Sequence, residues 1–234
     1  MREDGRVAMD LHWTAMPSYF AVSLDPKGLW ERLEPIDLVG TAVLGLPQED
    51  VLLFLCIHGF KHGWERLGWI CDGAELLRVR QRMDWGGVLE QTQASGSMRI
   101  LLLGLLLASD LFGAAIPEGI AQRLQTDAAV TRLGAQMCAQ LSRQADSSPK
   151  VFETLLFHLR GRECPRDKLR YCVHRPTTLT AGDCALLRLP DALFPLYYLL
   201  RPIRLHLLRR SLPFVPWSVQ LFGAYAKRLV KRRR

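Results

Sequence analysis

From Pro47 to Arg160, the sequence alternates between apolar segments of helical length and short groups of helix-breaking residues. Within 64–82, apolar residues recur at positions 67, 70, 74 and 77, which is the spacing of one helix face. Breakers such as Ser95-Gly96-Ser97, Gly113 and Pro117 separate the segments. This pattern predicts an array of helices over a segment that begins at Pro47 and over Trp64–Arg82, Trp85–Gln93, Met98–Phe112, Glu118–Leu124, Ala128–Arg143 and Val151–Arg160.

The residues before Pro47 have the patterns of short strands. Apolar and polar residues alternate in Val7–Trp13, which places Asp10 and His12 on the exposed face of a half-buried strand. In Ile36–Leu46, two apolar runs flank a central glycine, which indicates a hairpin. We therefore expect a mainly α chain in which a strand and a hairpin precede the helical array.

Three regions follow from these patterns: 1–46 with strands, 47–176 with helices, and 177–234 as a basic extension rich in Leu, Pro and Arg. The last region has prolines at 190, 195, 202, 213 and 216. Proline inside a helix removes a backbone hydrogen bond and clashes with the preceding turn. The extension is therefore predicted to form short helical pieces, such as Phe194–Leu200 and Ile203–Arg210.

The positive charge of the chain lies in its C-terminal part. Residues 192–234 contain ten Lys and Arg and no Asp or Glu, whereas residues 1–191 have a balance of −2. The main body is therefore not expected to bind nucleic acid through a general basic surface. The tail is interpreted as a packed structural extension, a contact to an anionic membrane surface, or a phosphate-binding segment. Its aromatic and leucine content favours a membrane or protein partner over nucleic acid.

The composition predicts a folded, cytoplasmic protein. Apolar residues make up 49% and charged residues 23% of the 234 residues, which suffices for a packed core. The N-terminus lacks the apolar region of a secretory signal, and no apolar run approaches the ~20 residues of a spanning helix. The six cysteines form no CxxC pair, which indicates reduced thiols. The basic tail is the candidate contact to the inner face of the membrane.

The densest group of chemically versatile residues is 56–72, CIHGFKHGWERLGWICD. His58 and His62 are four residues apart and share a helix face, which is a spacing that can hold a metal. A zinc protease, however, has Glu directly after the first His, and Gly59 stands there. A zinc site with Cys56 and Cys71 is also disfavoured, because Cys56 points about 200° away from His58 on an ideal helix.

Two further interpretations of this segment remain open. The histidines form an interhelical packing network, or they belong to a polar patch in which Lys61 or His62 meets a phosphate or carboxylate. Trp64, together with Trp69 and Trp85, is expected to anchor the core. Asp72 is predicted to form an ion pair with Arg66 or Lys61 rather than to act in catalysis.

Asp10 is a candidate metal ligand. Enzymes that transfer phosphoryl or nucleotidyl groups place several strand-borne carboxylates around two Mg²⁺ ions. The chain contains no Asp-x-Asp pair to accompany Asp10, and it contains no G-x-S-x-G, P-loop or G-x-G-x-x-G motif.

Several segments together resemble a known family: DLHW at 10–13, LPQEDVLLFLCIHGFKHGWERLGWICD at 46–72 and MDW at 83–85. They resemble the uncharacterised bacterial nucleotidyltransferase family of the polymerase-β-like superfamily. The signature His-x-x-Lys-His-x-Trp-x-x-Leu-x-Trp-x-x-Asp is filled at every position between His58 and Asp72. RPTTLTAGD at 175–183 and PDALFPLYYLLRPIRL at 190–205 also look like the family's C-terminal part.

The resemblance implies transfer of a nucleoside monophosphate from an NTP to an unidentified acceptor. It makes Asp10 a catalytic Mg²⁺ ligand whose Asp-x-Asp partners are missing, so residues 1–46 become a remnant of an α/β domain and the chain is expected to be truncated and inactive alone. The substrate contacts that it implies are His12, His58, Lys61, His62, Trp64 and Asp72. The alternative is a non-catalytic helical adaptor with a basic membrane-surface tail. A sheet fragment without its neighbours also predicts self-association.

Overall fold

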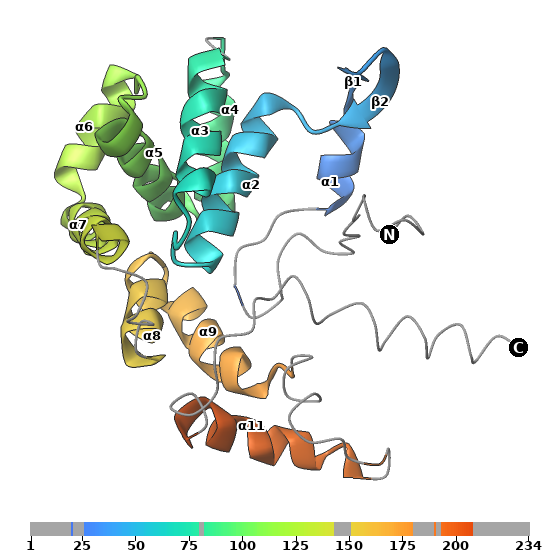
Figure 1. Ribbon diagram of the computed structural model, residues 1–234, viewed down its shortest axis with the longest axis vertical. Coiled ribbons are helices and arrows are strands. Elements are labelled where there is room, and N and C mark those ends of the chain that lie inside the picture. The colour runs from blue at the N-terminus through green and yellow to red at the C-terminus, as the bar shows by residue number, and fades with distance from the viewer. Residues whose placement is uncertain are drawn as a thin grey trace, which may run out of the picture. The chain divides into compact units, whose positions relative to one another are not determined.

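A computed structural model describes residues 20, 26–79, 82–142, 151–179, 190 and 193–207 (Figure 1). The chain divides into two compact units, Met1–Leu169 and Arg170–Arg234. The described part is mainly helical, and a two-stranded antiparallel sheet lies near the N-terminus. This confirms the predicted fold class. None of the described helices combines the length and the apolar character needed to cross a membrane.

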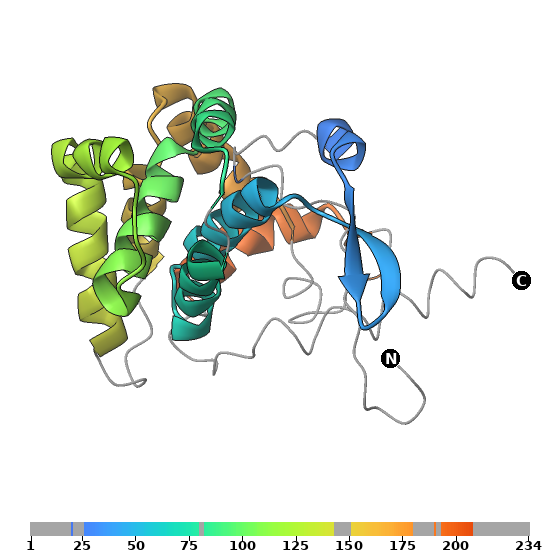
Figure 2. The ribbon, with the colours of Figure 1, turned by 90° about the horizontal axis from the view of Figure 1, so that it is seen from above.

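The predicted hairpin is confirmed. Helix α1 (Pro26–Glu31) precedes strands β1 (Glu34–Leu38) and β2 (Thr41–Gly45), which pair with Leu38 opposite Thr41. The connecting residues Val39 and Gly40 have φ of 53° and 79°, as a two-residue hairpin turn requires. The hairpin and α1 lie on the other side of α2 from α6 and α7 (Figure 2). The strand predicted over Val7–Trp13 lies outside the described residues.

The helical array follows the predicted segments closely. Its helices are α2 (Gln48–Lys61), α3 (Leu67–Val79), α4 (Trp85–Ser95), α5 (Met98–Phe112), α6 (Glu118–Thr126), α7 (Ala128–Ser142), α8 (Val151–Arg160) and α9 (Pro165–Thr177). Helix α9 was not predicted, because Leu169 and Val173 are exposed and Tyr171 is the one buried residue among its described side chains, so no periodic apolar face is present. The proline at its first position was the available signal.

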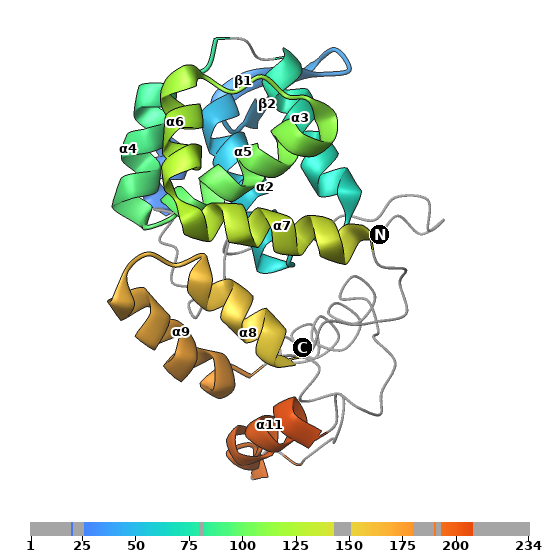
Figure 3. The same ribbon diagram turned by 90° about the vertical axis from the view of Figure 1, so that its left-hand side faces the viewer.

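Helix α5 is the centre of the first unit. It is apolar on all sides and contacts α2, α3, α4, α6 and α7. Figure 3 shows it enclosed by α3, α6 and α7. An all-round apolar helix is stable in water only when neighbours cover it on every side. The other helices of this unit therefore owe their arrangement to α5.

The first turn of α2 holds two other parts of the unit. The Asp50 carboxylate, 4% exposed, accepts hydrogen bonds from Arg32 Nε and Nη2 at 2.9 Å each and from Gln91 Nε2 at 2.8 Å. Glu49 Oε1 accepts from the backbone N–H of Asp84 at 2.9 Å. The two acids thus connect α2 to the residue after α1 and to α4. Their negative charges also interact favourably with the positive end of the α2 dipole.

Helix α2 ends in a Schellman motif that directs Trp64 into the core. Gly63, with φ of 64°, donates to the Phe60 carbonyl at 3.1 Å, and the Trp64 N–H donates to the Gly59 carbonyl at 2.8 Å. Trp64 itself has φ of 50° and is 2% exposed. The helix predicted from Trp64 therefore begins later, at Leu67.

Trp64 lies against two glycines on different helices. A Cβ at Gly59 on α2 would overlap the six-membered ring of Trp64, and a Cβ at Gly104 on α5 would lie 3.3 Å from that ring and 2.5 Å from Cys56 Sγ. Both positions therefore need glycine for a close approach rather than for a turn. This contact confirms Trp64 as a core anchor.

In the second unit, helix α11 (Leu196–Leu207) differs from the prediction. It runs through Pro202 as one helix, although two pieces were expected on either side of that proline. Pro202 supplies no N–H to the Tyr198 carbonyl. Packing just before it holds the helix: Tyr197 is buried, and Arg201 donates to the Arg175 carbonyl from Nε at 3.2 Å and Nη2 at 3.0 Å. Tertiary contact here overrides local propensity.

The packing of Trp64 on Gly59 gives a stability prediction. We expect Gly59→Ala to lower the free energy of unfolding by about 1–3 kcal/mol, since the added methyl group must displace the indole ring. The measurement is urea unfolding followed by circular dichroism.

Gly73→Ala is the matched control for this prediction. Gly73 lies inside α3 with no atom within 4 Å of an added Cβ. Alanine there should raise the free energy of unfolding by about 0.5–1 kcal/mol. Equal effects at the two positions would contradict the packing argument.

Candidate functional site

The structure brings together three rings from the signature segment. The ring centroids of His58 and His62 are 4.7 Å apart, and each lies 5.1 Å from the ring of Trp69. We call these three residues the histidine–tryptophan cluster. His58 comes from the last turn of α2, His62 caps that helix, and Trp69 comes from the start of α3. The α2–α3 turn therefore builds the cluster.

Cationic side chains adjoin the cluster. The guanidinium carbon of Arg66 lies 5.5 Å from the Trp69 ring centroid, a cation–π arrangement. Lys61 is in the last turn of α2, and burial lowers the pKa of its ammonium group. Arg66 was not predicted as a site residue, because it lies between α2 and α3, where no helical spacing relates it to the histidines.

Burial and neighbouring charges keep His62 uncharged at neutral pH. Its pKa is lowered to about 4, first by burial and then by His58, Lys61 and Arg66. A neutral imidazole presents one N–H donor and one acceptor nitrogen. Together with Lys61 and Arg66 it can bind an anionic group, such as a phosphate or carboxylate.

The described residues do not fit a metal site at this cluster. Within 26–79, 82–142 and the other described stretches, no group of three or more His, Cys, Asp or Glu can hold a metal ion. Cys56 packs against Gly104, and burial raises the pKa of its thiol to about 12. A metal-binding cysteine is a thiolate, so Cys56 is unsuited to that role. His58 and His62 therefore have no third ligand in the part of the chain described.

The other predicted site residues lie elsewhere. Trp64 is in the core, and its Nε1 is buried with no hydrogen-bond partner in the described structure. Asp72 is exposed and forms no ion pair with any other described residue, so the pairing expected with Arg66 or Lys61 is absent. Asp10 and His12 lie outside the described residues.

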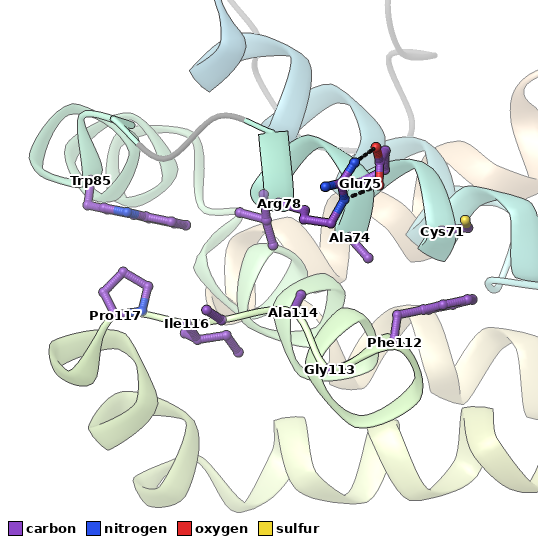
Figure 4. A pocket seen from close by; sticks show the side chains of 12 residues that line it. Cys71, Ala74, Glu75, Arg78, Trp85, Phe112, Gly113, Ala114, Ile116 and Pro117 are labelled. Carbon is purple, nitrogen blue, oxygen red and sulfur yellow. Dashed lines mark hydrogen bonds and ion pairs between the residues drawn. The ribbon is translucent and has the colours of Figure 1, made fainter.

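A separate pocket opens on α3 (Figure 4). Its volume is about 660 Å³, and it lies between α3, the start of α4 and the segment after α5. In its wall Arg78 donates to Glu75 from Nε at 2.8 Å and from Nη2 at 2.6 Å, and Trp85 and Phe112 also line it. Arg78 and Trp69 are nine residues apart, about 180° around the helix. The pocket and the histidine–tryptophan cluster therefore use opposite faces of α3.

MDW at 83–85 has a structural explanation. Met83 is buried, and the Asp84 carboxylate accepts the Gly87 N–H at 3.1 Å and so caps α4. Trp85 lines the pocket. The pocket itself was not predicted, because its walls come from segments that are far apart in the sequence.

Comparison with known proteins gives one match. The model of a family described as an uncharacterised nucleotidyltransferase matches residues 1–113, a range that includes the hairpin, α2 to α5 and the histidine–tryptophan cluster. This supports a nucleotidyltransferase-like family for the chain. The match does not extend to 175–183 or 190–205, where a resemblance was also expected. No curated protein and no solved structure matches the chain.

The low pKa of His62 predicts a pH dependence of stability. Unfolded histidine titrates near pH 6.5, whereas folded His62 stays neutral down to about pH 4. Between these values the unfolded chain binds more protons, so the free energy of unfolding falls as the pH drops through this window. We expect His62→Gln to reduce that fall, as measured by urea unfolding between pH 7 and pH 4.

His174→Gln serves as the control, because His174 is exposed on α9. It should leave the pH dependence as it is in the unsubstituted chain. A direct check is the imidazole titration of His62 by NMR, and a midpoint near 6.5 would contradict the argument.

Proposed function

We propose that this chain belongs to a nucleotidyltransferase system that transfers a nucleoside monophosphate from an NTP to an acceptor. The observation that carries the proposal is the family match over residues 1–113, which contains the histidine–tryptophan cluster. The half-buried Lys61 and the exposed Arg66 beside a neutral imidazole suit a polyanionic substrate such as a triphosphate. The acceptor is not specified by any side chain described.

In this proposal Lys61 and His62 contact the phosphates. Lys61 is partly buried at the end of α2, and a phosphate oxygen would accept a charge-assisted hydrogen bond from its ammonium group. His62 adds an N–H donor. His58 and Trp69 pack against the His62 ring and hold its orientation. Asp72 and His12 are further candidate contacts from the same similarity.

Asp10 is proposed as a Mg²⁺ ligand. A two-metal centre stabilises the attacking and leaving oxygens of the transferred group, and it needs more than one carboxylate. The 234 residues contain no Asp-x-Asp pair to join Asp10, and the described residues contain no group that fits a metal. We therefore propose that these 234 residues bind nucleotide without turning it over.

Isothermal titration with Mg-ATP tests the binding step. We expect the unsubstituted chain to bind, and Lys61→Ala to weaken binding about tenfold or more, because a hydrogen bond to a charged group contributes ~1.5–3 kcal/mol. The matched control is Arg78→Ala. It also removes one positive charge, but on the face of α3 that lies opposite the histidine–tryptophan cluster. No heat from the unsubstituted chain, or equal weakening by both variants, would contradict the proposal.

The second expected result is that no nucleotide is transferred by the 234 residues alone. The measurement is incorporation of label from α-labelled ATP into added acceptor mixtures. Turnover that persists through purification and disappears in Asp10→Ala would show that a single carboxylate suffices, contrary to the expectation.

A further inference from the structure

A group of large apolar side chains is exposed where the chain enters α11. Leu199 is 68% exposed, and the others lie between 41% and 49%. The rings of Phe194 and Tyr198 pack edge to face with centroids 6.5 Å apart. We call this group the α11 apolar surface; its members are Leu193, Phe194, Leu196, Tyr198 and Leu199. A contiguous exposed surface of this kind usually marks a contact with a partner or a membrane.

The opposite side of α11 is occupied within its own unit. Tyr197 is 4% exposed and Arg201 is 5% exposed, and Arg201 donates twice to the Arg175 carbonyl. Leu199 lies two residues from Tyr197, about 200° around the helix. The α11 apolar surface therefore is not the side by which this helix packs on its own fold.

The sequence that contains and follows this surface carries charge of one sign. Residues 192–234 contain ten Lys and Arg and no Asp or Glu. Exposed leucine and aromatic side chains beside uncompensated positive charge are the composition of helices that lie in the plane of an anionic membrane surface. Each Lys or Arg near such a surface adds attraction that salt weakens.

We propose that the α11 apolar surface docks the protein on an anionic lipid bilayer. This surface enters the boundary between head groups and acyl chains, with Phe194 and Tyr198 at the level of the head groups, and the net positive charge of the sequence from 192 to 234 attracts the lipid phosphates. This proposal does not depend on the proposed function, because it uses no residue of the family match.

Charge favours a membrane over the other possible occupants. A nucleic acid would neutralise the positive residues but leave the leucines in water. A second copy would bring two segments of charge +10 together, which is unfavourable. An anionic bilayer would neutralise the positive charge and would also remove the apolar side chains from water.

Vesicle flotation with the full chain tests the proposal. The vesicles are phosphatidylcholine alone, or phosphatidylcholine with about one third phosphatidylglycerol, which supplies the anionic surface. We expect binding to the mixed vesicles at least tenfold stronger than to the neutral ones, and a decrease of that binding as NaCl is raised. Equal binding to both vesicles, or none to either, would overturn the proposal.

A double variant separates docking on lipid from charge attraction alone. Leu196→Ser with Leu199→Ser removes apolar side chains that are 41% and 68% exposed, and we expect binding to fall about tenfold or more. The control is Leu67→Ser with Val79→Ser, two exposed apolar residues at the ends of α3, which should bind like the unsubstituted chain. Unchanged binding by the α11 variant would overturn the proposal.

Two further measurements distinguish a membrane from a second copy and from a nucleic acid. Sedimentation that shows a dimer in the unsubstituted chain and a monomer in the Leu196/Leu199 variant would assign the α11 apolar surface to a second copy and overturn the proposal. Tighter binding to single-stranded RNA than to mixed vesicles at equal salt would do the same in favour of nucleic acid. A circular dichroism spectrum like that of the unsubstituted chain confirms that each variant is folded.

Discussion

The contact of Trp64 with Gly59 and Gly104 is the constraint on which the first unit depends. It brings α2 to α5 at a distance that no side chain on either glycine would permit, and it places the indole at the turn before α3. The positive φ values of Gly63 and Trp64 make that turn tight. Because the turn also positions His62 and the start of α3, the core packing and the geometry of the histidine–tryptophan cluster have the same origin.

This common origin explains why the signature segment mixes two kinds of residue. Trp64 and the glycines near it serve the fold. His58, Lys61 and His62 lie at the C-terminal end of α2 and remain partly exposed. Burial lowers the pKa of Lys61, and burial together with the neighbouring His58, Lys61 and Arg66 lowers the pKa of His62. Because the two imidazoles pack against each other and against Trp69, little of their side-chain freedom remains to be lost when an anion binds.

The helices could be predicted from the sequence because their apolar residues face one core and glycine or proline separates them. The sequence was insufficient for prediction where tertiary contacts determine the local structure. Pro202 lies inside α11 because the packing of Tyr197 and Arg201 holds the helix. Helix α9 shows no periodic apolar face, since Tyr171 is the one buried residue among its described side chains. At the site, the pairing of His58 with His62 followed from their spacing. The approach of Trp69 and Arg66, and the pocket beside Arg78, depended on how α3 packs, which no local pattern contains.

The family match ends at residue 113, just after α5, yet the core does not end there. Helix α5 is apolar on all sides, and α7 covers one of them through Val130, Leu133 and Met137, all of which are buried. Gly134 lets α7 approach so closely that a Cβ there would lie 2.6 Å from the Leu106 side chain. The matched segment therefore leaves an apolar face that this chain covers with residues outside the match. Family similarity and folding unit thus have different boundaries in this protein, and α6 and α7 belong to the unit that supports the site.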